Sequence, residues 1–169
     1  MEMLDIFDIN GNYLGERSRD FCHKDNPGVY HKAVLVWFKN SDGEILVTKR
    51  GRNKKQYPGK WEMAAAGHVD AGEEPIQTCL REVKEELGIE LKEEEVEYLT
   101  EWLIQEEWEL AQIYLVKKDI PLENITIQKE EIDEVKWMKY NDFVNLLFSS
   151  LFCEYENNQY KKYIAKILG

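Results

Sequence analysis

The chain lacks the features that mark membrane proteins and secreted proteins. Its longest uncharged apolar run, residues 33–38, is far shorter than the ~20 residues that a membrane-spanning helix needs. The first residues, Met1 to Asp5, contain neither the basic region nor the apolar core of a signal peptide. We therefore expect a cytoplasmic protein with no membrane partner.

Cysteine is scarce, and the three residues Cys22, Cys79 and Cys153 contain no Cys-x-x-Cys pair. This spacing excludes a disulfide framework and a zinc site built from thiolates. Cys79 falls on the apolar side of a predicted helix, where we expect it to be a small buried hydrophobic residue.

Basic residues are few, because 22 lysines and arginines stand against 33 aspartates and glutamates, which leaves a net charge of −11. This balance argues against a nucleic-acid polymer as partner, since phosphate backbones bind to basic surfaces. A small phosphate ligand remains compatible, held by a metal ion or by a few local basic residues. The 169 residues, 43% of them hydrophobic, fit a single globular domain over residues 1–169.

Turn signals and hydrophobic periodicity predict a layered α/β (α+β) fold with a mixed sheet. Asn10-Gly11 indicates an N-terminal hairpin within about residues 1–20, and Asp42-Gly43 indicates another between 33–38 and 45–47. The other predicted elements are a loop at 51–60, a short segment at 61–66, a helix at 75–87, strands at about 96–104, 110–117 and 135–138, and helices at about 141–152 and 157–168. Helical spacing in the last helix predicts a docking face formed by Tyr160, Tyr163, Ile164 and Ile167.

The helix predicted at 75–87 carries an unusual acidic face. Its apolar side would pack on the sheet, while Glu82, Glu85 and Glu86 fall together on another arc roughly 100° wide. Like charges three and four residues apart destabilise an isolated helix, so this arc is either a solvated surface or a site for a hard cation. Mg²⁺ suits the second interpretation, because it binds carboxylates and keeps waters that phosphate oxygens can replace. Gly67 would let the preceding loop approach such an ion closely.

The stretch around this helix resembles the complete Nudix box, with Gly67, Glu73 and the run Arg81-Glu82-Val83-Lys84-Glu85-Glu86-Leu87-Gly88-Ile89 at the family's spacing. The resemblance implies an α/β/α sandwich, in which residues 67–89 form a loop–helix–loop motif. It also implies that water attacks a diphosphate with the help of Mg²⁺, for which Mn²⁺ could substitute. Glu82, Glu85 and Glu86 would hold the metal with the Gly67 carbonyl, although Glu82 could instead activate the water. Glu73 and Arg81 would pair with each other and brace the loop.

Outside the box, the chain resembles the branch of this family that contains isopentenyl-diphosphate isomerase. Similar segments are His31-Lys32-Ala33, Pro58-Gly59-Lys60-Trp61 and Ala66-Gly67-His68. Isomerases have their catalytic cysteine where this chain has Ala66, and their box is degenerate. Isomerisation needs protons to be added and removed at carbon, and the thiol that serves one of these steps is missing here. An isomerase is therefore less favoured than a hydrolase. His31 and His68 match positions that bind metal in the isomerases, and the sequence leaves open whether they bind metal here.

Glu107 and Glu109 resemble two carboxylates of the isomerases that lie on a strand after the box. Alternation along a strand would place both on the same face. Either residue could complete the metal site or act as the general base, and a solvated polar face is the alternative.

Basic and aromatic residues are candidates for substrate binding. The densest basic cluster would contact the phosphates of a substrate unless it forms a solvated loop, and it consists of Lys49, Arg50, Arg52 and Lys54. Three tryptophans could stack on the organic part of a substrate or belong to the core, and they are Trp61, Trp102 and Trp108.

The leading hypothesis is an enzyme that hydrolyses a nucleoside diphosphate derivative or another small organic diphosphate. A catalytically silent Nudix module that binds a nucleotide for regulation is the main alternative, although it would not need all the glutamates. An isopentenyl-diphosphate isomerase comes third. The sequence does not determine the substrate or the oligomeric state. A homodimer is one of the states that it allows.

Overall fold

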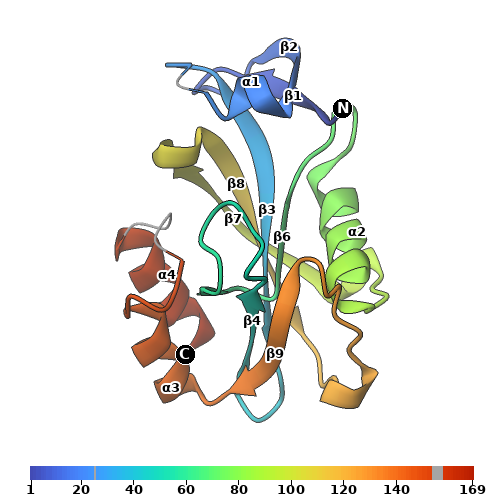
Figure 1. The fold of residues 1–169 in the computed structure, drawn as a ribbon, viewed down its shortest axis with the longest axis vertical. Coiled ribbons are helices and arrows are strands. Elements are labelled where there is room, and N and C mark those ends of the chain that lie inside the picture. The colour runs from blue at the N-terminus through green and yellow to red at the C-terminus, as the bar shows by residue number, and fades with distance from the viewer. Residues whose placement is uncertain (25, 154–157) are drawn as a thin grey trace.

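The computed structural model describes residues 1–24, 26–153 and 158–169, and a β-sheet forms its middle layer (Figure 1). Helix α2 (Pro75–Leu87) packs on one face of the sheet, and α3 (Tyr140–Leu147) and α4 (Asn158–Leu168) pack on the other face. The predicted α/β/α sandwich is therefore confirmed. Within the described ranges, no helix is both long and apolar enough to cross a membrane.

Strand β3 (Tyr30–Lys39) is the centre of the sheet. It pairs antiparallel with β6 (Ala65–His68) and parallel with β8 (Glu109–Lys117), and β8 pairs in turn with β7 (Val96–Ile104). The first residues of β3 also pair with β1 (Met3–Phe7). The start of β3 therefore lies where the N-terminal strand, β6 and β8 meet.

The predicted hairpin at Asp42-Gly43 forms only near its turn. β3 and β4 (Ile45–Arg50) pair at a single position and then separate, because β4 pairs with β5 (Trp61–Glu62) and β9 (Ile132–Met138) instead. The divergence opens a space whose lining includes residues of both strands.

Side chains that alternate along β3 build one hydrophobic core on each face of the sheet. Leu35 and Trp37 belong to the cluster that contains α3 and α4, whereas Val36 and Phe38 belong to the cluster that contains α2. A strand covered on both faces is apolar throughout. Burial on both faces explains why the apolar run at residues 33–38 contains no polar residue.

Helix α2 has the predicted limits. The backbone N–H of Glu74 donates to the side-chain oxygen of Gln77 at 2.9 Å, as in a capping box. Gly88 ends the helix in the left-handed conformation, with a φ of 67°. Cys79 and Val83 are fully buried against the sheet, which agrees with the expectation for Cys79. This apolar side fixes the rotation of the helix about its axis.

The prediction for the first C-terminal helix was wrong about its end, because α3 ends at Leu147 rather than at residue 152. The hydroxyl of Ser149 donates to the carbonyl of Leu146 and accepts from the N–H of Leu151. A serine that bonds locally to the backbone competes with the helical pattern. The chain therefore turns after Leu147.

The docking face of α4 is only partly as predicted. Tyr160 and Ile164 are fully buried, but Ile167 is 38% exposed, and Leu168 packs into the core in its place. The spacing of four residues keeps these buried side chains on one side of the helix. Residue 157, the predicted first residue, lies outside the described ranges.

The other predicted elements correspond to strands, and several short elements have no sequence signal. The N-terminal hairpin is formed by β1 and β2 (Tyr13–Ser18), and the segment at 61–66 forms β5 and the first half of β6. The elements too short for periodicity to detect are α1 (Arg19–Cys22) and the 3₁₀ turns η1 (Glu93–Glu95), η2 (Gln105–Glu107) and η3 (Leu122–Asn124).

A buried hydrogen bond joins the sheet to α4 and can be tested by mutation. The indole N–H of Trp37 donates to the hydroxyl of Tyr160 at 3.0 Å. Tyr160→Phe leaves this donor unpaired, which costs roughly 1–3 kcal/mol. We expect urea denaturation to show a fall of that size in the free energy of unfolding. Tyr163→Phe is the matched control, because that ring stacks on Trp102 at the surface of the same core. Equal stability of the two variants would contradict the expectation.

Candidate active site

The space between β3 and β4 is a cavity of about 420 Å³. Its lining includes residues of β3, β6, α2, the loop at 51–60 and the N-terminal segment. Nine aspartate and glutamate side chains line it, against four arginines and lysines. An excess of negative charge in a partly enclosed space favours cations and disfavours a bare anion.

The three glutamates on the acidic face of α2 all line this cavity. Burial raises the pKa of Glu86 well above its usual value, and the neighbouring carboxylates of Glu62 and Glu82 raise it further. Burial also raises the pKa of Glu82, against the opposing charge of Arg81. Glu85 is half-exposed at the rim. The helix thus presents carboxylates at three depths, and two of them are costly to ionise without a nearby cation.

Gly67 makes room for one of these carboxylates. It lies in β6, opposite Val34 of β3, and not in a loop as the box resemblance implied. A Cβ atom at this position would overlap the carboxylate of Glu82. The glycine therefore lets the Glu82 side chain lie directly against the strand.

Arg81 joins the start of the box to the helix. Its guanidinium donates to both carboxylate oxygens of Glu73, at 3.2 and 3.0 Å, and to Glu82 at 2.7 Å. Thr78 donates to the same Glu73 carboxylate at 2.7 Å. These bonds lower the pKa of Glu73. The planar fork of arginine suits such paired contacts, so Arg81 holds both the loop and a cavity carboxylate.

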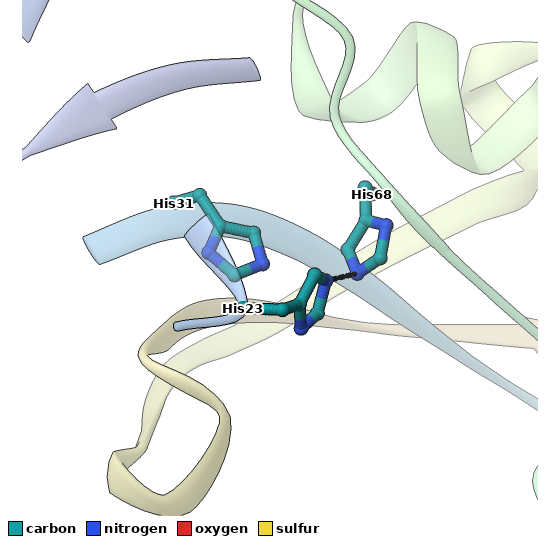
Figure 2. Close-up of side chains that lie close together, drawn as sticks. All are labelled: His23, His31 and His68. Carbon is teal, nitrogen blue, oxygen red and sulfur yellow. Dashed lines mark hydrogen bonds between the residues drawn. The ribbon is translucent and has the colours of Figure 1, made fainter. Parts of the chain in front are cut away.

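A second cluster lies where β3 begins, and it consists of three histidines whose rings lie close together at steep angles to one another (Figure 2). His23 follows α1, His31 lies in β3 and His68 ends β6. The Nε2 atoms of His23 and His68 are 3.2 Å apart, and one ring nitrogen from each of the three residues lies within 4.8 Å of the others. His31 is fully buried, and neither of its ring nitrogens has a hydrogen-bond partner among the described residues.

Two carboxylates complete the surroundings of the imidazoles. Glu109 Oε1 lies 3.3 Å from His68 Nε2 and 3.5 Å from His31 Nε2, and Glu2 Oε1 lies 3.1 Å from His68 Nδ1. Burial raises the pKa of Glu109, but the imidazoles of His31 and His68 outweigh it and bring the pKa to about 2. Burial likewise opposes the charged form of His68, yet Glu109 and Glu2 raise its pKa to about 9.

This second cluster has the donors that a divalent cation requires. Imidazole nitrogens and carboxylate oxygens are ligands of Zn²⁺, Mn²⁺ and related ions. A buried imidazole with unpaired nitrogens is also costly unless something occupies its lone pair. The residues therefore fit a bound cation, with His23, His31, His68 and Glu109 as the nearest donors.

The expectation that Glu107 and Glu109 share a strand face was wrong. Glu109 is the first residue of β8, but Glu107 lies in the 3₁₀ turn η2, and Trp108 between them is left-handed with a φ of 55°. The turn still brings Glu107 to the cavity, where its carboxylate is 3.9 Å from His23 Nδ1. His23 itself had no motif in the sequence, although it is one of only three histidines in the chain.

The basic cluster of the sequence divides between the cavity and the surface. Arg50 donates to both oxygens of Glu62, at 3.1 and 2.9 Å, and Lys54 pairs with Glu131. Both basic residues line the cavity. Lys49 lies over the ring of Trp61, and the side chain of Arg52 is 84% exposed beside Asp133. These last two do not line the cavity, because alternation along β4 and the loop turns them away.

The tryptophans also differ in their positions. Trp61 is 8% exposed and belongs to the core, and Trp102 packs against Tyr160 and Tyr163. Trp108 is half-buried beside the ring of Tyr30 and lines a shallower hollow next to the cavity. Trp108 therefore lies beside a hollow that a ligand could enter.

Comparison with known proteins identifies a family. Residues 29–155 match the NUDIX domain. The chain is 32% identical to Nudix hydrolase 3 of Arabidopsis thaliana over 86% of its length, although it spans only 20% of that protein. It is 29% identical to a Nudix hydrolase of Listeria monocytogenes, covering 92% of this chain and 90% of the relative. It is also 29% identical to an isopentenyl-diphosphate Δ-isomerase of Corynebacterium glutamicum, covering 81% and 76%.

A solved structure agrees with the fold. The protein DR0079 from Deinococcus radiodurans superposes with a TM-score of 0.74, covering 99% of this chain and 97% of that one. Its sequence identity is 17%, so the likeness concerns the fold.

Mutation of Arg81 tests whether the bridge from α2 to Glu73 stabilises the fold. Arg81→Ala leaves the carboxylates of Glu73 and Glu82 without their cation, and hydrogen bonds to charged groups contribute roughly 1.5–3 kcal/mol. We expect the midpoint of thermal unfolding to fall, with a loss of about 1–3 kcal/mol in the free energy of unfolding, because the group is partly exposed.

Lys84→Ala is the matched control on the same helix, since Lys84 pairs with Glu90 on the exposed side. Exposed pairs contribute little, so we expect no measurable shift in its melting temperature. A similar fall in both variants would mean that the loss does not come from the bridge to Glu73.

Proposed function

Because the chain belongs to the NUDIX domain family, we propose that it is a Mg²⁺-dependent hydrolase of a nucleoside diphosphate derivative or another small organic diphosphate. The observation that carries the proposal is the convergence of Glu82, Glu85 and Glu86 on one cavity that also contains Arg50 and Lys54. Mn²⁺ is the expected substitute for Mg²⁺, because both prefer oxygen ligands.

The charge of the cavity requires cations before the substrate can bind. Nine carboxylates face four basic side chains there, and a diphosphate would add further negative charge. All four of the basic groups, Arg19, Arg50, Lys54 and Arg81, already pair with cavity glutamates. Metal ions held by the carboxylates without a basic partner would offset most of this negative charge, so this chain is expected to bind the substrate as a metal complex.

The glutamates of α2 take different roles in this proposal. Glu85 and Glu86 would hold the Mg²⁺ ion, with the Gly67 carbonyl as a further ligand. When bound, this ion would supply charge neutralisation at the phosphate and would lower the pKa of a nearby water. Glu82 accepts the proton of the attacking water, because a general base is most effective when its pKa is raised toward the working pH, and burial raises the pKa of Glu82. Glu109, with a pKa of about 2, is a weaker base.

Arg50 and Lys54 position the substrate in this proposal. Their partners Glu62 and Glu131 also line the cavity, so a phosphate can exchange with a carboxylate at each basic group. The guanidinium of Arg50 offers a planar fork to phosphate oxygens, and Lys54 offers a point charge. Arg81 remains a structural bridge.

The three histidines and Glu109 form a second cation site in this proposal, and Glu107 lies at its edge. Imidazole ligands favour ions such as Zn²⁺, Mn²⁺ or Co²⁺ over Mg²⁺, so the two sites would differ in the ion that they prefer. The fully buried ring of His31, whose nitrogens have no hydrogen-bond partner among the described residues, supports this assignment.

A substrate panel tests the proposed activity. We expect release of phosphate or a monophosphate from at least one nucleoside or organic diphosphate with Mg²⁺, and no interconversion of isopentenyl and dimethylallyl diphosphate, because Ala66 offers no thiol. Glu85→Gln removes a ligand charge and should lower kcat/KM at least about 10²-fold, which corresponds to about 2.7 kcal/mol.

Glu90→Gln is the control for this experiment, because it makes the same substitution outside the cavity. Binding of a nucleotide without turnover by the wild type would support the silent module, and turnover of isopentenyl diphosphate would support the isomerase. Near-wild-type activity of Glu85→Gln at low Mg²⁺ would show that the acidic face does not hold the ion.

Gly67→Ala tests the role of the Glu82 carboxylate. The three atoms nearest to the added methyl group all belong to the Glu82 side chain, so we expect that side chain to move and the melting temperature to stay close to that of the wild type. We expect kcat to fall at least about tenfold, since a displaced general base loses part of its ~10²–10⁴-fold effect. The Mg²⁺ concentration that gives half the maximal rate should change little. If that concentration rises while kcat at saturation is kept, Glu82 holds the ion instead.

A further inference from the structure

We propose that Glu2 is a positioning residue for the imidazole cation site, because its carboxylate orients the ring of His68. This inference rests on the second cation site proposed above. Glu2 Oε1 lies 3.1 Å from Nδ1 of His68, on the side of the ring away from the other two histidines. Glu2 also lines the cavity, although it precedes His68 by 66 residues.

The contact determines which nitrogen of His68 faces the site. An ionised carboxylate only accepts hydrogen bonds, so Nδ1 must carry the proton that it donates to Glu2. Nε2 is then the nitrogen that can offer a lone pair to a cation. It lies 3.2 Å from His23 Nε2 and 3.3 Å from Glu109 Oε1, at the centre of the cluster. Metal-binding histidines commonly bond to a carboxylate through the other ring nitrogen, which fixes the ring and strengthens the ligand.

The Glu2 carboxylate is itself held in place. Its second oxygen accepts a hydrogen bond from Arg19 at 3.1 Å, and its backbone carbonyl accepts from the N–H of the same residue at 3.0 Å. Arg19 begins α1, and His23 follows the end of this helix. The next residue, Met3, accepts a backbone hydrogen bond from Ala71 at 2.9 Å, just beyond β6. The N-terminal strand therefore connects the segments that carry His23 and His68.

The test measures metal binding and the state of the His68 ring, neither of which requires a substrate. Purified protein freed of metal by chelation is titrated with Co²⁺, and binding is followed by visible absorption and calorimetry. We expect Glu2→Ala to weaken Co²⁺ binding by about 10–100-fold, the usual effect of removing such a partner. Glu2→Gln should lose less, because its amide oxygen can still accept from Nδ1. Both variants keep the backbone bond to Arg19, so thermal unfolding should change little.

Nitrogen-15 spectra of the Zn²⁺-loaded protein give an independent readout. The wild type should show His68 protonated at Nδ1 and coordinated through Nε2, and Glu2→Ala should lose this single state. Glu16→Ala, an exposed carboxylate of the same hairpin, is the matched control and should bind Co²⁺ as the wild type does.

The outcomes separate this inference from the cation site on which it rests. His31→Ala should abolish the Co²⁺ signal of the imidazole site. If the wild type and His31→Ala bind Co²⁺ equally, the imidazole site is wrong and the role of Glu2 falls with it. If His31→Ala loses binding while Glu2→Ala binds within about twofold of the wild type, only the positioning role of Glu2 is overturned.

Discussion

Repulsion among the carboxylates of one cavity is the constraint to which the surrounding structure is adapted. Carboxylates that share a small, partly buried space cannot all ionise at low cost. The chain meets this cost with separate partners: Arg81 pairs with Glu82, Arg50 with Glu62, and Lys54 with Glu131. For Glu86, burial and the neighbouring carboxylates of Glu62 and Glu82 raise the pKa instead. We propose that the charge that remains uncompensated is balanced by a bound cation.

The divergence of β3 and β4 makes this cavity possible. A fully paired hairpin would close the sheet and leave no room for α2 to present its glutamates to β6. Because β4 finds other partners in β5 and β9, the hydrogen bonds lost to β3 are made elsewhere. Both hydrophobic cores stay intact on either side of the opening. The site is thus obtained without sacrificing the packing that stabilises the sheet.

Local signals predicted local structure well. The limits of α2 followed from Pro75, Gly88 and the apolar spacing, and the arc of glutamates followed from helical geometry. Long-range partners had no such signal. The pairing of Arg50 with Glu62 depends on how β4 meets β5, and the position of Glu107 depends on a left-handed Trp108 that alternation cannot predict. His23 lacks a motif because its neighbours in space, His31 and His68, are distant in sequence.

The separation of these histidines along the sequence affects the conformational freedom of the unfolded chain. His23 and His68 are 45 residues apart in sequence, and the cysteines of the described chain are all free. An ion shared by the imidazoles would act as a reversible crosslink that closes this long loop. Closing a loop removes configurations mainly from the unfolded chain, and the effect grows slowly with loop length. The same ion would therefore link the N-terminal hairpin to the central strands and stabilise the fold, as disulfides do in other small domains.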